Sequence, residues 1–217
     1  MNKERKLIIA GNWKMNKTVA EALALVDDLT RDLAAVKEVD IVVCPPFTAL
    51  ESVSKAILES KNIKLGAQNM SENNFGAFTG EICAGMLKEF SVRYVILGHS
   101  ERRQFQKESD ALIAKKAAAA HAASLKPIVC VGETLAEREG SLTEKVLEMQ
   151  VRGSLTEGIG GLCAPRRLER AVRRALGKAR LRVLVREPIG LARGDFGEPR
   201  LNDLGDASVQ LLAPAPE

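Results

Sequence analysis

Short apolar runs alternate with longer amphipathic stretches along the first 155 residues. Five runs have strand length and are rich in Val and Ile; they cover residues 6–10, 39–44, 63–67, 94–97 and 127–131. The stretches between them carry apolar residues at helical spacing, which predicts helices over residues 18–33, 48–58, 81–90, 108–123 and 135–155, the first of them capped by Thr18 or a neighbour. The strands are short and do not alternate apolar with polar residues, so we expect both faces to be buried. The pattern predicts an α/β protein with a parallel sheet and right-handed crossovers.

The spacing of about 25–35 residues per strand–helix unit fits a doubly wound sheet or a (β/α)8 barrel. No G-x-G-x-x-G follows the first strand, which weakens the dinucleotide-binding alternative. After about residue 163 the rhythm stops. Residues 179–189 have the composition of one further strand, residues 190–206 that of a loop, and the terminal L-L-A-P-A-P-E that of a tail.

Charge is distributed unevenly between the two parts of the chain. Residues 1–150 carry 20 basic and 20 acidic side chains, whereas residues 151–217 carry 12 basic, 11 of them Arg, and 8 acidic. An Arg-rich segment can bind nucleic acid. This one lacks interleaved aromatic residues for base stacking and contains acid throughout, so we expect no nucleic-acid partner.

Cysteine spacing and hydropathy limit location and metal chemistry. No run approaches the roughly 20 apolar residues of a membrane span, and the first residues lack a signal-peptide apolar region. The four cysteines are far apart, without a C-x-x-C pair: Cys44, Cys83, Cys130 and Cys163. We therefore expect reduced thiols in a cytoplasmic protein, with no membrane contact and no zinc site.

Candidate catalytic residues follow three of the predicted strands. Asn12 and Lys14 follow the first, His99 and Glu101 the fourth, and Glu133 the fifth. The carboxyl ends of parallel strands form one rim of a barrel, where active sites are built. Lys14 would neutralise a small anionic substrate, His99 would donate a hydrogen bond, and the two glutamates would orient Lys14 and its loops. Taken singly, Lys14 with Glu101 is better explained as a structural ion pair and Asn12 as a turn residue, but this explanation does not account for the residues taken together.

Six motifs extend this picture. They are A-G-N-W-K-M-N at 10–16, C-P-P-F at 44–47, G-A-Q-N at 66–69, G-A-F-T-G-E-I at 76–82, Y-V-I-L-G-H-S-E-R-R at 94–103 and C-V-G-E-T-L-A-E-R at 130–138. In sequence, order and spacing they closely resemble the triosephosphate isomerase family. The resemblance covers roughly residues 5–162 and divides the chain into β/α units 1–5 (1–162) and a divergent Arg-rich segment (163–217), in the same domain or as a disordered tail.

The resemblance implies a (β/α)8 barrel, here incomplete or irregular after its fifth unit. It implies a homodimer formed through the loop Gly76–Ile82, with Thr79 near the tip, and no metal or cofactor. The implied activity interconverts glyceraldehyde 3-phosphate and dihydroxyacetone phosphate through an enediolate, a step of glycolysis and gluconeogenesis. The implied substrate is therefore a small phosphorylated triose, handled in the cytoplasm.

The resemblance also assigns residue roles. Asn12 and Lys14 match substrate-contacting positions, and Lys14 is the cation for the phosphate and the developing oxyanion. His99 matches the electrophile, which in this family is a well-known case of a neutral imidazole at a helix N-terminus. Glu101 matches the carboxylate that holds the lysine. The predicted catalytic residues are thus His99 and Lys14, and the predicted substrate-binding residues are Asn12, Lys14 and Glu101.

The second part of the chain departs from the family pattern. The general base is expected near residue 169, but Glu169 lies in L-E-R-A-V-R-R-A without the Pro, Trp and Gly of the family's lid segment. Glu187-Pro188 repeats the strand–Glu-Pro order about 18 residues later. The phosphate-gripping glycine segments have at best a faint counterpart in residues 204–208. A change of reading frame near residues 160–170 would explain the departure, as would natural divergence or a chimera.

Three hypotheses follow from the sequence. The first is a triosephosphate isomerase of this family. The second is a non-catalytic, truncated or frame-shifted barrel fragment that keeps the dimer-interface loop. The third is another phosphosugar barrel enzyme that uses Glu187 as its base.

Overall fold

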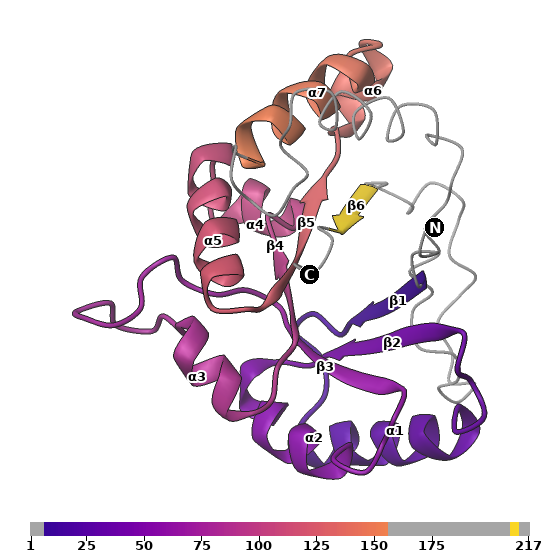
Figure 1. Cartoon of the computed structure of the whole chain (residues 1–217). Coiled ribbons are helices and arrows are strands. Elements are labelled where there is room, and N and C mark those ends of the chain that lie inside the picture. The colour runs from indigo at the N-terminus through magenta and orange to yellow at the C-terminus, as the bar shows by residue number, and fades with distance from the viewer. Residues whose placement is uncertain (1–6, 156–208, 213–217) are drawn as a thin grey trace, which may run out of the picture. The chain divides into compact units, whose positions relative to one another are not determined.

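The computed structural model describes residues 7–155 and 209–212 (Figure 1). These residues form two compact units, and the chain passes between them three times. The first unit contains the described residues up to Leu97 together with Ala119–Pro127, and the second contains Gly98–Ala118 with the described residues from Ile128 onward.

Four parallel strands form the sheet of the first unit. They are β1 (Leu7–Asn12), β2 (Val39–Cys44), β3 (Ile63–Ala67) and β4 (Tyr94–Leu97). Each pairs with the next along the chain, and Asn12 at the end of β1 lies opposite Cys44 at the end of β2. All four residues of β4 are buried, as predicted from its unbroken apolar run. The predicted bounds of β2, β3 and β4 are confirmed.

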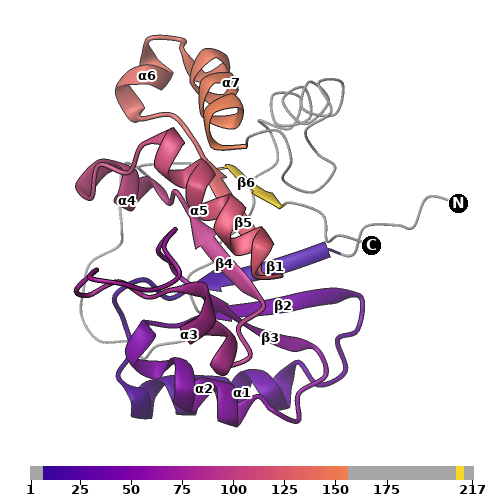
Figure 2. The ribbon, with the colours of Figure 1, turned by 60° about the vertical axis from the view of Figure 1, so that its left-hand side comes forward.

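Three helices and a short 3-10 helix complete the first unit. These are α1 (Val19–Asp32), η1 (Phe47–Ala49), α2 (Leu50–Ala56) and α3 (Ala84–Glu89). Helices α1 and α2 lie side by side on one face of the strands β1–β3 (Figure 2). The predicted cap of α1 is confirmed at Thr18, whose hydroxyl accepts from the Glu21 backbone N–H while the Glu21 carboxylate accepts from the Thr18 N–H.

The second unit contains four helices and an antiparallel strand pair among its described residues. Its elements are α4 (Ser100–Phe105), most of α5 (Asp110–Ala122), most of β5 (Lys126–Val131), α6 (Leu135–Glu139), α7 (Thr143–Ser154) and β6 (Val209–Leu212). Strand β6 pairs antiparallel with β5, with Ile128 opposite Leu212. Among the described residues, no helix is long and apolar enough to cross a membrane.

Two predictions about local structure were wrong. The single helix expected over residues 135–155 is two helices, because Ser141 takes a φ of +57°, which an α-helix cannot accommodate. Leu211 and Leu212, expected in a tail, belong to strand β6, which satisfies backbone groups of β5. The strand predicted over residues 179–189 lies outside the described residues, as does nearly all of the segment 163–217.

Candidate active site

The end of β1 carries the first pair of predicted site residues. The Lys14 backbone N–H donates to the Asn12 side-chain Oδ1 over 3.0 Å. Lys14 has a φ of +52°, an uncommon conformation for a residue with a side chain. Trp13 between them is 7% exposed, and its backbone N–H donates to the Cys44 carbonyl oxygen. A buried indole and two hydrogen bonds thus fix the backbone that presents Asn12 and Lys14.

Gln68 supports the same segment, although the sequence reasoning assigned it no role. Its amide Nε2 donates to the carbonyl oxygens of Lys14 (2.9 Å) and Cys44 (2.8 Å). One side chain following β3 therefore ties together the residues that end β1 and β2. The G-A-Q-N motif could have identified Gln68 as a candidate. Its hydrogen-bond partners could not be predicted, because they are backbone groups of residues distant in the sequence.

The second unit contains the other predicted pair. His99 immediately precedes α4, and its side chain is 13% exposed. The Glu101 backbone N–H donates to His99 Nδ1 over 3.3 Å. The Glu101 carboxylate, with 44% of its side chain exposed, lies 3.5 Å from the same nitrogen. The structure brings His99 and Glu101 together, as it does Asn12 and Lys14 within the first unit.

The hydrogen bond to Nδ1 matches one of the two neutral forms of the imidazole. A nitrogen that accepts from a backbone N–H must have a lone pair, which is the form with Nδ1 unprotonated. The N–H cannot change its role, whereas the 3.5 Å distance to the carboxylate is long for a hydrogen bond. The neutral form that matches this hydrogen bond carries its proton on Nε2, and in that form Nε2–H is a hydrogen-bond donor.

Gly98 makes this arrangement possible. It has a φ of +68°, and a Cβ there would lie 2.7 Å from Ile113 Cδ1. A side chain would meet both backbone strain and a packed neighbour. The Gly-His order in the G-H-S-E motif is therefore a requirement of local geometry.

The other acidic candidates differ in their surroundings. The Glu133 side chain is 5% exposed and pairs with Arg138 Nη2 at 2.8 Å, so it holds the loop that follows its own strand. Glu169, Glu187 and residues 204–208 lie outside the described residues. No cluster of three or more His, Cys, Asp and Glu side chains arranged for a metal ion occurs within residues 7–155.

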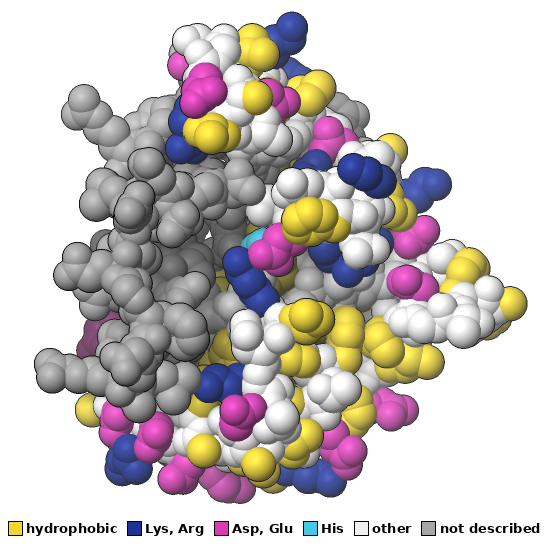
Figure 3. Space-filling view, turned by 180° about the vertical axis from the view of Figure 1, so that it is seen from behind, with side chains coloured by type: hydrophobic (Ala, Val, Ile, Leu, Met, Phe, Trp, Pro, Cys, Tyr) yellow, Lys and Arg dark blue, Asp and Glu magenta, His cyan; other side chains and the backbone are white. Residues whose placement is uncertain are grey.

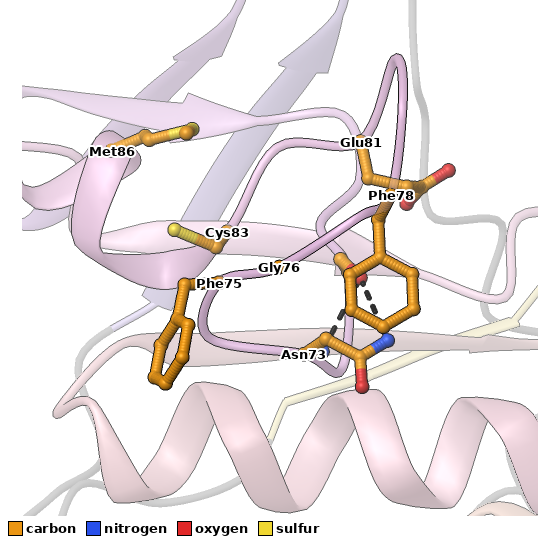
Figure 4. Close-up of a pocket in the computed structure, with 8 residues that line it drawn as sticks. Asn73, Phe75, Gly76, Phe78, Glu81, Cys83 and Met86 are labelled. Carbon is orange, nitrogen blue, oxygen red and sulfur yellow. Dashed lines mark hydrogen bonds between the residues drawn. The ribbon is translucent and has the colours of Figure 1, made fainter.

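The loop between β3 and α3 contains the predicted interface segment Gly76–Ile82. Its base is closed by the Ser71 N–H, which donates to the Ile82 carbonyl oxygen over 2.8 Å. Phe75 is 89% exposed and Phe78 46% exposed, on a loop whose surface shows hydrophobic side chains (Figure 3). Residues of this loop and of α3 line a pocket (Figure 4); they are Ser71, Asn73, Phe75, Gly76, Phe78, Glu81, Cys83 and Met86.

Comparison with known proteins places these motifs in one family. Residues 7–160 match the family model described as triosephosphate isomerase. The chain is 55% identical over 148 residues to triosephosphate isomerase of Clostridium novyi (strain NT), covering 68% of this chain and 58% of that protein. It is 55% identical over 155 residues to that of Alkaliphilus metalliredigens (strain QYMF), covering 71% and 61%.

A solved structure agrees with the sequence relatives. The crystal structure of triosephosphate isomerase from Bartonella henselae superposes with a TM-score of 0.66 at 42% identity, covering 71% of this chain and 63% of that one. The chain spans about three fifths of the length of the curated relatives it matches. The expected fold class is confirmed: an α/β protein of the (β/α)8 type whose regular strand–helix alternation, in the described part, ends after the fifth unit. The chain belongs to the triosephosphate isomerase family.

Proposed function

We propose that this chain interconverts glyceraldehyde 3-phosphate and dihydroxyacetone phosphate in the cytoplasm, without metal or cofactor. The observation that carries the proposal is the hydrogen bond from the Glu101 N–H to His99 Nδ1. It leaves Nε2–H as a donor for the oxygen that becomes negative when the substrate loses its α-proton. Family membership supplies the reaction that needs such a donor.

The remaining residues complete the proposed chemistry. The Lys14 ammonium attracts the phosphate and stabilises the developing oxyanion, and Asn12 contacts the substrate. The Glu101 backbone N–H holds the imidazole, and the resemblance to the family assigns its carboxylate to the lysine. The base that removes the α-proton belongs to the segment after residue 155, where Glu187 and Glu169 are the two candidates.

A coupled isomerase assay on the purified 217-residue chain tests this proposal. His99→Gln should lower kcat by about 100-fold or more, since one preorganised donor to an oxyanion is worth that much. The matched control is His121→Gln in α5, which should leave turnover unchanged. A folded wild-type chain without turnover would instead favour the non-catalytic fragment.

Two substitutions identify the base once turnover is measured. If Glu187 is the base, Glu187→Gln should abolish most activity, while Glu169→Gln should behave like the parent chain. The reverse result would assign the base to Glu169. Activity like that of the parent chain in both variants would exclude both residues as the base.

The proposal includes a homodimer formed through Gly76–Ile82. The closed loop base and the exposed Phe75 and Phe78 support it, because a preordered loop with apolar side chains buries area at little entropic cost. Phe75→Glu should shift the mass measured by light scattering from two chains to one. Leu58→Glu is the control, since Leu58 is 73% exposed in the same unit outside the loop. A monomeric wild-type chain would contradict this part of the proposal.

A further inference from the structure

Arg103 connects four elements of the second unit through one guanidinium. Nε donates to the Gly98 carbonyl oxygen over 2.9 Å, and Nη1 donates to Asp110 Oδ1 on α5. Nη2 donates to the Cys130 carbonyl oxygen of β5 (3.1 Å) and to Ser154 Oγ on α7 (3.2 Å). The side chain is 15% exposed, so these contacts form largely away from water.

The acceptors around Arg103 are themselves held in place. Ser154 is fully buried, and its hydroxyl donates to Asp110 Oδ1 over 2.9 Å. Helix α7 approaches Asp110 closely because Gly153 has no side chain: a Cβ there would lie 2.7 Å from Asp110 Cβ. A Cβ on Gly98 would lie 3.2 Å from Arg103 Nη2. The guanidinium therefore has little freedom to move.

Both peptide groups that flank His99 are held by hydrogen bonds, one of them from the Arg103 side chain. The Gly98 carbonyl belongs to the peptide before His99, and the Arg103 side chain fixes its orientation. The His99 carbonyl belongs to the peptide after it, and it accepts from the backbone N–H groups of Arg102 (2.9 Å) and Arg103 (3.0 Å), so the Arg103 side chain acts only on the first of these peptides. Because each peptide group is planar, holding both carbonyls restricts the backbone torsions of His99. The ring in turn must stay where the Glu101 N–H reaches Nδ1.

We infer that Arg103 is a positioning residue for His99: it holds the imidazole in the orientation in which Nδ1 accepts and Nε2–H donates. This inference rests on the proposed function for its catalytic meaning, but the ring orientation can be measured without turnover. Arginine suits the task because its planar group offers five donors in fixed directions. Lysine has one nitrogen and reaches only part of this set of acceptors.

Long-range ¹H–¹⁵N spectra of the histidine rings test the inference on the full chain. The chain has two histidines, so His121→Gln assigns the signals. At pH 8, above the ordinary titration range of histidine, wild-type His99 should show Nδ1 as the unprotonated nitrogen and Nε2 as the protonated one. Arg103→Met should move both nitrogens toward intermediate shifts, because the two neutral tautomers then exchange. Arg103→Lys should restore the wild-type shifts in part.

Arg102→Met is the matched control, since Arg102 is the neighbouring residue on α4 and its guanidinium donates to Glu108 instead. It should lower Tm without moving the His99 signals. The inference is overturned if Arg103→Met keeps the wild-type ring shifts, or if Arg102→Met moves them equally. Should Arg103→Met fail to fold, Ser154→Ala decides: it loosens the guanidinium and should broaden or shift the His99 signals, and unchanged signals would overturn the inference.

Kinetics on the same preparations separates the inference from the proposed function. In a chain that turns over substrate, Arg103→Met should lower kcat about 100-fold with little change in KM, the typical cost of a misplaced catalytic group. A wild-type chain without turnover contradicts the proposed function, while the ring spectra still decide the role of Arg103.

Discussion

The Tyr94 hydroxyl donates a hydrogen bond to Asp40 Oδ2 over 3.1 Å, which joins the start of β4 to the start of β2 across 54 residues of sequence. The Lys126 ammonium lies 5.5 Å from the centre of the same ring. Burial, followed by the charge of Asp40 and this hydrogen bond, raises the pKa of Tyr94 to about 12. This cluster is at the amino ends of the strands, where a barrel places residues for stability.

Titration of the phenol tests this contact directly, because Tyr94 is the only tyrosine of the chain. The absorbance of the folded chain should stay flat through pH 10, the midpoint expected for an unfolded tyrosine. Since the pKa is raised on folding, the contribution of Tyr94 to stability is complete below about pH 10 and is lost as the pH rises toward 12. Asp40→Asn should lower the midpoint but keep it above 10, because burial remains. A wild-type midpoint equal to that of the chain in denaturant would contradict the pKa shift.

Gly98→Ala should destabilise the chain by about 2–4 kcal/mol, combining left-handed backbone strain with overpacking against Ile113. Gly80→Ala separates the two effects, since Gly80 has a φ of +89° but a Cβ there would have no neighbouring atom within 4 Å. Its cost should be about 1–2 kcal/mol, the strain alone. Adding Ile113→Val to Gly98→Ala removes the Cδ1 atom that a Cβ would meet, so the double variant should be more stable than the sum of the single ones. Urea denaturation of the wild-type chain, the three single variants and the double variant measures these differences, and simple additivity would refute the packing explanation.

Glu108 and Lys116 form a buried ion pair at 2.6 Å, with side chains 3% and 4% exposed. Lys116→Met should cost about 3–5 kcal/mol, because it removes one of the two cations, Lys116 and Arg102, that face a buried carboxylate. The double variant Glu108→Leu/Lys116→Met should recover much of that loss. Lys115→Met is the control, since Lys115 is exposed on the same helix and should change stability by less than about 0.5 kcal/mol. Equal losses at positions 115 and 116 would refute the importance of the pair.

The same pair predicts a loss of stability in acid. Burial acts to raise the pKa of Glu108, but the hydrogen bonds and charges of Lys116 and Arg102 outweigh it, so its pKa lies below the ordinary 4.5. A lowered folded-state pKa means that the stabilisation is present above about pH 4.5 and is lost as the pH falls through the folded-state value. Between about pH 6 and pH 3, the wild-type urea midpoint should fall more than that of Glu108→Leu/Lys116→Met. Parallel curves for the two proteins would exclude Glu108 as a source of the acid sensitivity.

Thiol labelling should distinguish Cys83 from Cys130. Burial raises the pKa of the Cys130 thiol to about 12, despite the opposing charge of Arg103, whereas Cys83 is half-buried beside the pocket. In a Cys163→Ser background at pH 8, Cys83 should react first with an aromatic disulfide reagent, and Cys130 should react only on unfolding. Cys83→Ser should remove the fast phase, and its persistence in that variant would contradict the assignment.

The sequence by itself determined the features that depend on neighbours along the chain. The short, mostly apolar segments of β2, β3 and β4, which do not alternate with polar residues, predicted buried parallel strands with the observed bounds, because burial on both faces favours apolar residues at successive positions. Thr18 predicted the start of α1, because a helix cap is made with residues only two or three positions along the chain. The motifs around Asn12, Lys14 and His99 identified the family.

Only the tertiary structure decided how these residues are held. The Gln68 amide bonds to carbonyl oxygens 54 and 24 residues away, and Arg103 reaches Cys130 and Ser154 at separations of 27 and 51. The break at Ser141 is likewise a backbone conformation that its residue type does not require. Most of these partners are backbone carbonyl groups. Every residue has a backbone carbonyl, so residue type does not reveal which one will accept the hydrogen bond. The sequence therefore shows which side chains can donate, but only folding brings a particular carbonyl within their reach.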